Sequence, residues 1–273
     1  MKKNTWKSAV AILAVSATIA ACNNTAKTDG TTNSADSTTV ADSAAAIAVN
    51  PLAHSKEFPG ASLKIASITS EKVGTDSAKV TVKYNVENFK LTEQTAHEHH
   101  MANSHDGQHI HFILDNSPYA ALYKPEHSVT VPVNSEHYLM SFLSRSYHES
   151  IKTADASKLV KFKVTADGKI EELAAPTDAA LFYSRPKGDY KGDDTKALLL
   201  DFFVANTELA ATGNKVKANI NGQEFTLDQW VPYEILNLPL GETTVKLSLI
   251  DKDGNAISGD NTSIERKVNL TAQ

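Results

Sequence analysis

The chain has 273 residues, a formal net charge of −5 and a single cysteine, Cys22. The mild negative charge, with no long basic run and no interleaved basic and aromatic residues, argues against a nucleic-acid partner. A single cysteine excludes an internal disulfide and a cysteine-rich metal site.

The first residues predict export and lipid anchoring. Residues 1–21 begin with lysines and continue as an apolar stretch from Ala9 to Ala21. That stretch is too short for a membrane span and has the form of a secretory signal. The letters IAAC, ending at Cys22, resemble a bacterial lipobox, which implies cleavage before Cys22 and lipidation of its sulfur. We expect a cell-envelope protein anchored to a bacterial membrane, on its periplasmic face or at the cell surface. The alternative is an ordinary signal peptide.

Residues 22–50 predict a disordered tether. They are rich in Thr, Ser, Ala, Asn and Asp and contain no aromatic residue. Such a stretch cannot bury enough apolar area to offset the entropy of ordering it. About 220 residues follow, enough for two domains of roughly 100 residues each.

The remaining sequence predicts an all-β protein. Short runs such as 79–86 and 243–250 alternate apolar and polar side chains, which is the pattern of half-buried antiparallel strands. Gly, Asn, Asp and Pro interrupt these runs about every ten residues, and no long amphipathic helix is visible. We predict two tandem immunoglobulin-like β-sandwich domains, residues 51–172 and 173–273.

The two halves align as a weak internal repeat. The matched segments are 82–91 with 200–209, 107–119 with 213–225, and 131–144 with 238–251. Between the first and second matches the register shifts by about twelve residues. The first domain therefore carries an insert between Leu91 and Gly107.

The repeat isolates the histidines as a feature of one copy. All ten lie in or before the first domain, and the insert holds His97, His99, His100 and His105. The second domain has Lys215, Lys217 and Thr244 where the first has His109, His111 and His137. The scaffold itself therefore does not require histidine at these positions.

The spacing of His109 and His111 predicts a metal site. Alternate residues on a strand place both rings on one face, about 7 Å apart at Cα, with Ile110 toward the core. Imidazole is a common ligand for copper and zinc. We predict a copper or zinc site with His109 and His111 as primary ligands. His137 or His148 would be the third, and the insert histidines auxiliary.

Other residue types near this pattern offer further contacts. Asp115 and Glu149 are candidate oxygen ligands, or partners that orient a ring. Met101 and Met140 lie in the same domain, and the apolar neighbours of Met140 favour a place in the core. Two plainer interpretations stay open: a solvated insert that titrates near neutral pH, and a strand face that is merely polar at His109 and His111.

Two segments resemble a known group of proteins. GQHIHFILDNSPY (107–119) and SRSYHESIK (144–152) resemble poorly characterised bacterial envelope lipoproteins with a Gly-x-His-x-His strand, a Leu-Asp-Asn turn and a Ser-Arg-x-x-His-Glu-Ser segment. The resemblance covers residues 80–165. It implies an immunoglobulin-like sandwich in which His109, His111, His137 and His148 converge, and it implies no particular activity.

No motif predicts an enzyme. The sequence has no nucleophile elbow, phosphate-binding loop or dinucleotide fingerprint. We predict a lipid-anchored envelope protein that binds copper or zinc for sequestration or delivery. The alternative is a non-catalytic adhesion or ligand-binding module without metal, in which Trp230 and the aromatic and basic run at 183–192 contact an unspecified partner.

Overall fold

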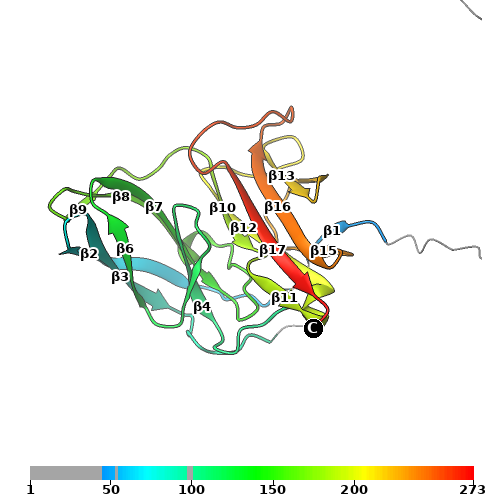
Figure 1. The fold of residues 1–273 in the computed structure, drawn as a ribbon, viewed down its shortest axis with the longest axis horizontal. Helices are drawn as coiled ribbons and strands as arrows, with labels where there is room; N and C mark the ends of the chain where they lie inside the picture. The colour runs from blue at the N-terminus through cyan, green and yellow to red at the C-terminus, as the bar shows by residue number, and fades with distance from the viewer. Residues whose placement is uncertain (1–44, 53–54, 97–100) are drawn as a thin grey trace, which may run out of the picture. The chain divides into compact units, whose positions relative to one another are not determined.

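The computed structural model describes residues 45–52, 55–96 and 101–273, and nearly all of their regular secondary structure is β-strand (Figure 1). Several predictions concern positions outside these residues: the signal sequence, Cys22, most of the tether, His54, His97, His99 and His100. Within the described ranges, no helix has the length and apolar composition that crossing a bilayer requires.

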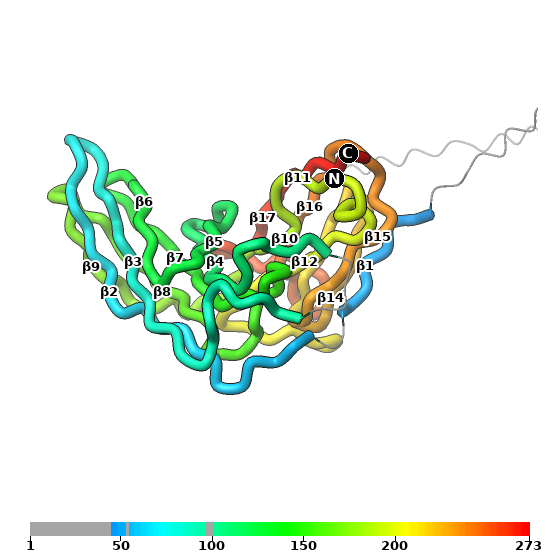
Figure 2. Tube along the Cα trace, turned by 90° about the horizontal axis from the view of Figure 1, so that it is seen from below, coloured from blue at the N-terminus to red at the C-terminus, as the bar shows by residue number. Residues whose placement is uncertain are grey.

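The first sandwich consists of two antiparallel sheets. One has the order β2-β3-β6, with β2 (Ser62–Val73), β3 (Ser77–Glu87) and β6 (Glu126–Pro132). The other has the order β5-β4-β7-β8-β9, with β4 (His109–Leu114), β5 (Ala120–Leu122), β7 (Ser135–Ser144), β8 (Ser157–Val164) and β9 (Ile170–Glu172). A short 3-10 helix, η1 (Ala154–Ala156), precedes β8. Figure 2 shows β2 and β3 running side by side.

The second sandwich also consists of two sheets, antiparallel except for one parallel pair at an edge. One sheet has the order β1-β15-β12-β10, with β1 (Ala48–Pro51), β10 (Ala180–Arg185), β12 (Ala197–Ala205) and β15 (Tyr233–Leu236). The other has the order β11-β17-β16-β13-β14, with β11 (Asp189–Lys191), β13 (Lys215–Ile220), β14 (Gln223–Leu227), β16 (Gly241–Ile250) and β17 (Ser263–Thr271). The 3-10 helix η2 (Gly192–Thr195) follows β11.

Strand order confirms the predicted fold and relates the two sandwiches. The sheet β2-β3-β6 corresponds to β10-β12-β15, and β5-β4-β7-β8 corresponds to β14-β13-β16-β17. Sheets of three and four strands with these connections define an immunoglobulin-like sandwich. The chain therefore contains two such sandwiches in tandem.

The cores follow from the predicted alternation. On β3, Val80 and Val82 are fully buried while Lys79 and Lys83 are exposed. Successive side chains of a strand point to opposite faces, so each such run supplies one face to the core. Each fully buried aliphatic side chain contributes about 1.5–3 kcal/mol to stability.

The predicted end of the tether at residue 50 is wrong. Strand β1 begins at Ala48 and pairs with β15, with Val49 opposite Ile235. Val49 and Ile47 also pack against the core of the second sandwich. The apolar residues from Ile47 to Val49 are enough to add an edge strand beside β15, even though the residues before them are mostly polar.

The predicted alignment of His137 with Thr244 is also wrong, by one residue. The backbone N–H of Tyr138 donates to Asp115 Oδ1 at 2.8 Å, as that of Thr244 donates to Asn221 Oδ1 at 2.9 Å. His137 therefore corresponds to Thr243. The turns before the two strands differ in length, so the two sequences match across them only with a gap.

A third apolar cluster joins the two sandwiches. Ile113 and Phe142 of the first contact Phe182 and Phe203 of the second, on sheet faces that point away from each sandwich's own core. The sheets that carry β4 and β10 are therefore buried on both faces. Side chains on the outer face of β4 become interior residues, and His109 and His111 lie on that face.

Candidate metal centre

Strand β4 places two histidines at the junction of the sandwiches. His109 and His111 alternate with Ile110, which lies in the core of the first sandwich. Both imidazole side chains have 0 % of their surface exposed. The prediction that the two rings share one face is correct. Their complete burial was not predicted, because it depends on the second sandwich.

The turn after β7 supplies a third histidine. Its ends are held together because the Arg145 N–H donates to Glu149 O at 2.9 Å and the His148 N–H donates to Arg145 O at 3.0 Å. The buried pair of the Arg145 guanidinium and the Glu149 carboxylate, 2.8 Å apart, reinforces this turn. His148 has a φ of +68°, in the left-handed region that only a few per cent of non-glycine residues adopt, histidine more often than most. Backbone strain of this kind is concentrated at functional sites.

Three ring nitrogens converge. His109 Nε2 lies 2.9 Å from His111 Nε2 and 3.1 Å from His148 Nδ1. The three candidate ligand atoms all lie within 4.8 Å of one another. The structure therefore brings together His109, His111 and His148, which we call the histidine triad.

Contacts at the other nitrogens orient the rings. His109 Nδ1 donates to the carbonyl of Gly107 at 2.8 Å, because a carbonyl can only accept. This leaves the Nε2 lone pair of His109 directed at the triad. His111 Nδ1 lies 3.0 Å from the hydroxyl of Ser184, a residue of β10 in the second sandwich. Such partners fix the tautomer and orientation of a metal-binding imidazole.

Tyrosine rings cover the triad. Tyr119 stacks on His111 with ring centroids 3.6 Å apart, and its hydroxyl lies 3.1 Å from His148 Nδ1. Tyr123 packs against His109 at 5.2 Å between centroids. The sequence offered no sign of Ser184 as a partner of the triad. Tyr119 ends one of the two segments on which the resemblance rested, without an assigned role.

The triad is held in its neutral form. The pKa of His109 is lowered to about 4, mainly by burial, with smaller contributions from Arg185 and Lys187 and an opposing one from the Gly107 carbonyl. Burial likewise places the pKa of His111 well below its usual range, and the pKa of His148 is lowered by burial and by Arg185. At neutral pH all three imidazoles therefore have lone pairs available for an ion.

The triad fits a transition-metal ion. Bonds of about 2.0–2.1 Å from one ion to two imidazoles place their nitrogens about 3.3 Å apart. The observed separations of 2.9 and 3.1 Å are close to this value, whereas the third, between His111 and His148, is up to 4.8 Å, so these two rings must move closer to share one ion. Hydrogen bonding also accounts for these contacts, because His111 Nε2–H can donate to His109 Nε2 while His148 Nδ1 accepts from the Tyr119 hydroxyl. A shared ion accepts lone pairs from all three.

Other predicted ligands lie elsewhere. His137 is buried, but its Nδ1 contacts Asp115 Oδ2 at 2.6 Å and its Nε2 contacts Ser135 Oγ at 2.6 Å. His105 is exposed and does not belong to the triad. Glu149 is paired with Arg145 rather than with a triad histidine.

The two methionines are core residues rather than ligands of the triad. Met140 is buried in the apolar cluster between the sandwiches, and Met101 is buried as well. The expected core position of Met140 is confirmed.

The described parts of the insert pack against the turn that carries His148. The Thr95 N–H donates to Ser146 Oγ at 3.1 Å, and the Ser104 N–H donates to Ser146 O at 2.8 Å. The hydroxyls of Ser104 and Tyr123 are 2.6 Å apart. Thr95 and Ser104 therefore attach the described parts of the insert to the turn that carries His148, while His105 is exposed.

The aromatic and basic run at 183–192 is only partly exposed, because Lys191 faces solvent whereas the aromatic residues are buried. Tyr183, Arg185 and Tyr190 are buried, because the run forms β10 and β11 and fills the second sandwich. Arg185 donates to the hydroxyl of Tyr190 at 3.0 Å. The sequence alone did not reveal that this run forms strands, because charged and aromatic residues are mixed within it.

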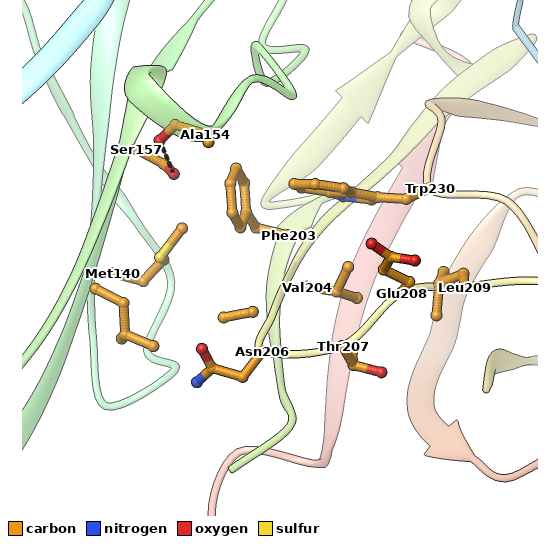
Figure 3. A pocket seen from close by; sticks show the side chains of 12 residues that line it. Met140, Ala154, Ser157, Phe203, Val204, Asn206, Thr207, Glu208, Leu209 and Trp230 are labelled. Carbon is orange, nitrogen blue, oxygen red and sulfur yellow. Dashed lines mark hydrogen bonds between the residues drawn. The ribbon is translucent and has the colours of Figure 1, made fainter. Parts of the chain in front are cut away.

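Trp230 lines a cavity beside η1. The cavity has a volume of about 620 Å³, and Figure 3 shows Phe203 and Trp230 on one side of it and Met140 opposite. Phe203 and Trp230 are in edge-to-face contact with centroids 4.6 Å apart. Glu208 is the only charged side chain of the lining, and among the described residues it has no ion-pair partner.

Comparisons with known proteins add little to these observations. No family model matches the sequence, and no curated protein matches it. A solved structure with a similar arrangement is that of the fibronectin(III)-like modules of CbhA from Clostridium thermocellum. It covers 77 % of this chain and 94 % of that chain, at 10 % sequence identity and a TM-score of 0.28. A score this low carries no argument, so the fold assignment rests on the strand order described above.

Proposed function

We propose that the protein is a binding protein of the cell envelope whose histidine triad holds one copper or zinc ion, for sequestration or delivery. The observation that carries this proposal is the convergence of three neutral, largely buried imidazoles from β4 and from the turn after β7. Neutral imidazole is a favoured ligand of both metals. The lipobox-like IAAC sequence supports a membrane anchor at Cys22.

The geometry favours holding an ion over catalysis at it. A catalytic zinc keeps an open position for water and substrate. Here His109 and His111 are fully buried, and the ring of Tyr119 covers His111. An ion in the triad would therefore have little room for a substrate. We assign a binding role without catalysis.

A metal titration tests the proposal. The purified full chain, without a polyhistidine tag, is titrated with copper(I), copper(II) and zinc, and its metal content as purified is measured. We expect one equivalent bound at sub-micromolar affinity, and a rise in thermal stability when it binds. The double variant His109→Ala/His111→Ala should lose this equivalent.

A matched variant controls for the loss of any histidine. His127 is a partly buried histidine on β6, in the opposite sheet of the same sandwich. His127→Gln should keep the bound equivalent. If the wild-type chain binds no metal, or if the double variant binds as well as the wild type, the proposal is wrong.

A second candidate function is the binding of a small organic ligand or partner without metal, and the cavity beside Trp230 favours it. Pockets of about 300–1,000 Å³ with aromatic walls and few polar groups are typical ligand sites. The apolar walls and the single carboxylate of Glu208 suit a neutral or cationic molecule with a flat apolar face. The β-sandwich architecture itself is common among adhesion and ligand-binding modules and is as compatible with this function as with metal binding.

Substitutions at the cavity separate the two candidates. Trp230→Ala removes one wall of the cavity, whereas His109→Ala/His111→Ala leaves it intact. Screening a library of small amphipathic molecules by thermal shift should give stabilising compounds for the wild type and the histidine variant, and none for Trp230→Ala. Equal shifts for all three proteins would exclude the cavity as the binding site.

A further inference from the structure

Two cationic side chains, Arg185 and Lys187, contact the ring of Tyr119 that covers the triad. Lys187 Nζ is 4.1 Å from the ring centroid of Tyr119 and donates to the Tyr119 carbonyl at 2.7 Å. The guanidinium carbon of Arg185 is 5.5 Å from the same centroid. The Tyr119 ring stacks directly on His111. Both side chains come from the second sandwich and are present whenever the sandwiches are docked.

No carboxylate compensates these charges. Among the described residues, Arg185 and Lys187 form no ion pair. Their hydrogen bonds go to neutral acceptors: Tyr190 Oη, the Lys187 carbonyl and the Tyr119 carbonyl. Asp115 is paired with His137 and Glu149 with Arg145, and Asp189, two residues after Lys187, forms no ion pair with it. The fixed charge around the triad is therefore positive, and its ligands are neutral.

The charge of a bound ion determines how strongly this environment opposes it. Repulsion from a fixed cation is proportional to the charge of the ion, so a divalent ion is opposed twice as strongly as a monovalent ion. The desolvation cost of a buried ion rises still more steeply with its charge. Divalent ions in buried sites are usually compensated by carboxylates or thiolates, and this triad has neither.

We infer that the triad selects a monovalent ion, copper(I), over zinc and copper(II). This inference rests on the proposed function, because it specifies which ion the same triad holds. Three neutral nitrogens satisfy the low coordination number that copper(I) accepts. The partly unpaired cations Arg185 and Lys187 act as selectivity residues and do not touch the ion.

Competition titrations of the full chain test the inference. Copper(I) is supplied without oxygen, from a chromogenic chelator, and zinc is measured against a fluorescent chelator. We expect copper(I) to bind more tightly than zinc. Lys187→Gln should raise the affinity for zinc more than that for copper(I). The ratio of the copper(I) affinity to the zinc affinity should therefore fall by on the order of tenfold.

Lys191→Gln is the matched control, because Lys191 lies in the same run but is exposed. It should leave the ratio unchanged. Circular dichroism and thermal unfolding establish that each variant is folded. If Lys187→Gln does not fold, the reduction potential of copper bound to the wild-type chain gives an independent result, since each tenfold preference for copper(I) raises it by about 59 mV.

The possible failures are distinguishable. Binding of zinc as tightly as copper(I), or a ratio that a folded Lys187→Gln variant does not change, overturns the charge selectivity and leaves a metal-binding triad. A reduction potential of the bound copper at or below that of aqueous copper also overturns the charge selectivity. Absence of binding for every ion overturns the proposed function and this inference together.

Discussion

Each strand histidine uses its two ring nitrogens for different contacts. In His109 and His111 the Nδ1 atoms contact Gly107 and Ser184, and the Nε2 atoms face each other. The Nδ1 contacts determine where the protons are placed, and so which lone pairs face the triad. The contact of His111 also links the triad to the second sandwich, because Ser184 belongs to that sandwich.

Removing this contact should weaken metal binding without abolishing it. Ser184→Ala leaves His111 free to rotate and to change tautomer, so we expect an affinity about tenfold lower with the same stoichiometry. The competition titration described above measures it. Ser248→Ala, at an exposed hydrogen bond with Ser263, serves as the control and should bind like the wild type. An unchanged affinity for Ser184→Ala would contradict a role in orienting the ring.

His137 is expected to act on stability alone. Its ring lies 2.6 Å from the Asp115 carboxylate, at the position where Thr243 contacts Asn221 in the second sandwich. His137→Ala removes a buried hydrogen-bonded partner, so we expect unfolding free energy to fall by about 1–3 kcal/mol. Urea denaturation measures this loss, and one metal equivalent should remain. Loss of metal binding from a folded variant would place His137 at the site.

At the scale of elements, the turn between β7 and β8 positions the third ligand. The residue at 148 must adopt a φ of +68°, which glycine adopts freely and alanine does not. Arg145, Glu149 and the insert residues Thr95 and Ser104 hold the turn in this form. The histidine is therefore kept there at a conformational cost.

This strain predicts an order among variants. His148→Gly and His148→Ala should both weaken metal binding, since both remove the ligand. Without metal, His148→Gly should be more stable than His148→Ala by about 1 kcal/mol, because glycine relieves the left-handed strain. Chemical denaturation of the metal-free variants measures the difference. Equal stabilities would mean that the turn relaxes when the histidine is removed.

At the scale of the whole molecule, a buried ion pair joins the two sandwiches. Asp201 of β12 is fully buried and accepts hydrogen bonds from Lys152 Nζ at 2.7 Å and Ser150 Oγ at 3.0 Å. The apolar cluster around Phe142 and Phe203 lies between the same two sandwiches. The described residues accordingly belong to one compact unit.

We expect the two sandwiches to unfold together. Asp201→Ala leaves the charge of Lys152 largely buried without its partner and should reduce the unfolding free energy by about 3–5 kcal/mol. In the wild type, Trp230 fluorescence and far-ultraviolet circular dichroism should give one coincident transition in urea. Two separated transitions in the wild type would show that the junction contributes little.

The metal-free protein should become less stable in acid. The pKa values of His109 and His111 are lower in the folded chain than the usual value of about 6.5. Below that pH the unfolded chain binds protons that the folded chain does not, so stability falls as pH falls from about 6.5 toward 4. Thermal unfolding across this range tests it. The variant His109→Ala/His111→Ala should show a shallower decline, and an equal decline would assign the acid sensitivity to other groups.

The sequence by itself determined the class of fold and the pair of histidines on one strand face. Alternation in β3 and β16 is a local pattern, because side chains alternate along a strand whatever surrounds it. The same rule placed His109 and His111 together and Ile110 in the core. The lipid anchor and the auxiliary role of His97, His99 and His100 stay predictions, since these positions lie outside the described residues.

Only the tertiary structure decided between His137 and His148 as the third member of the triad. Both follow β4 along the chain, but β7 directs His137 to Asp115, and the turn after β7 directs His148 back to β4. Docking of the second sandwich then buried the triad and brought Ser184, Arg185 and Lys187 beside it. These contacts join residues about seventy positions apart on different sheets, and no periodicity in one chain encodes which sheet faces will meet.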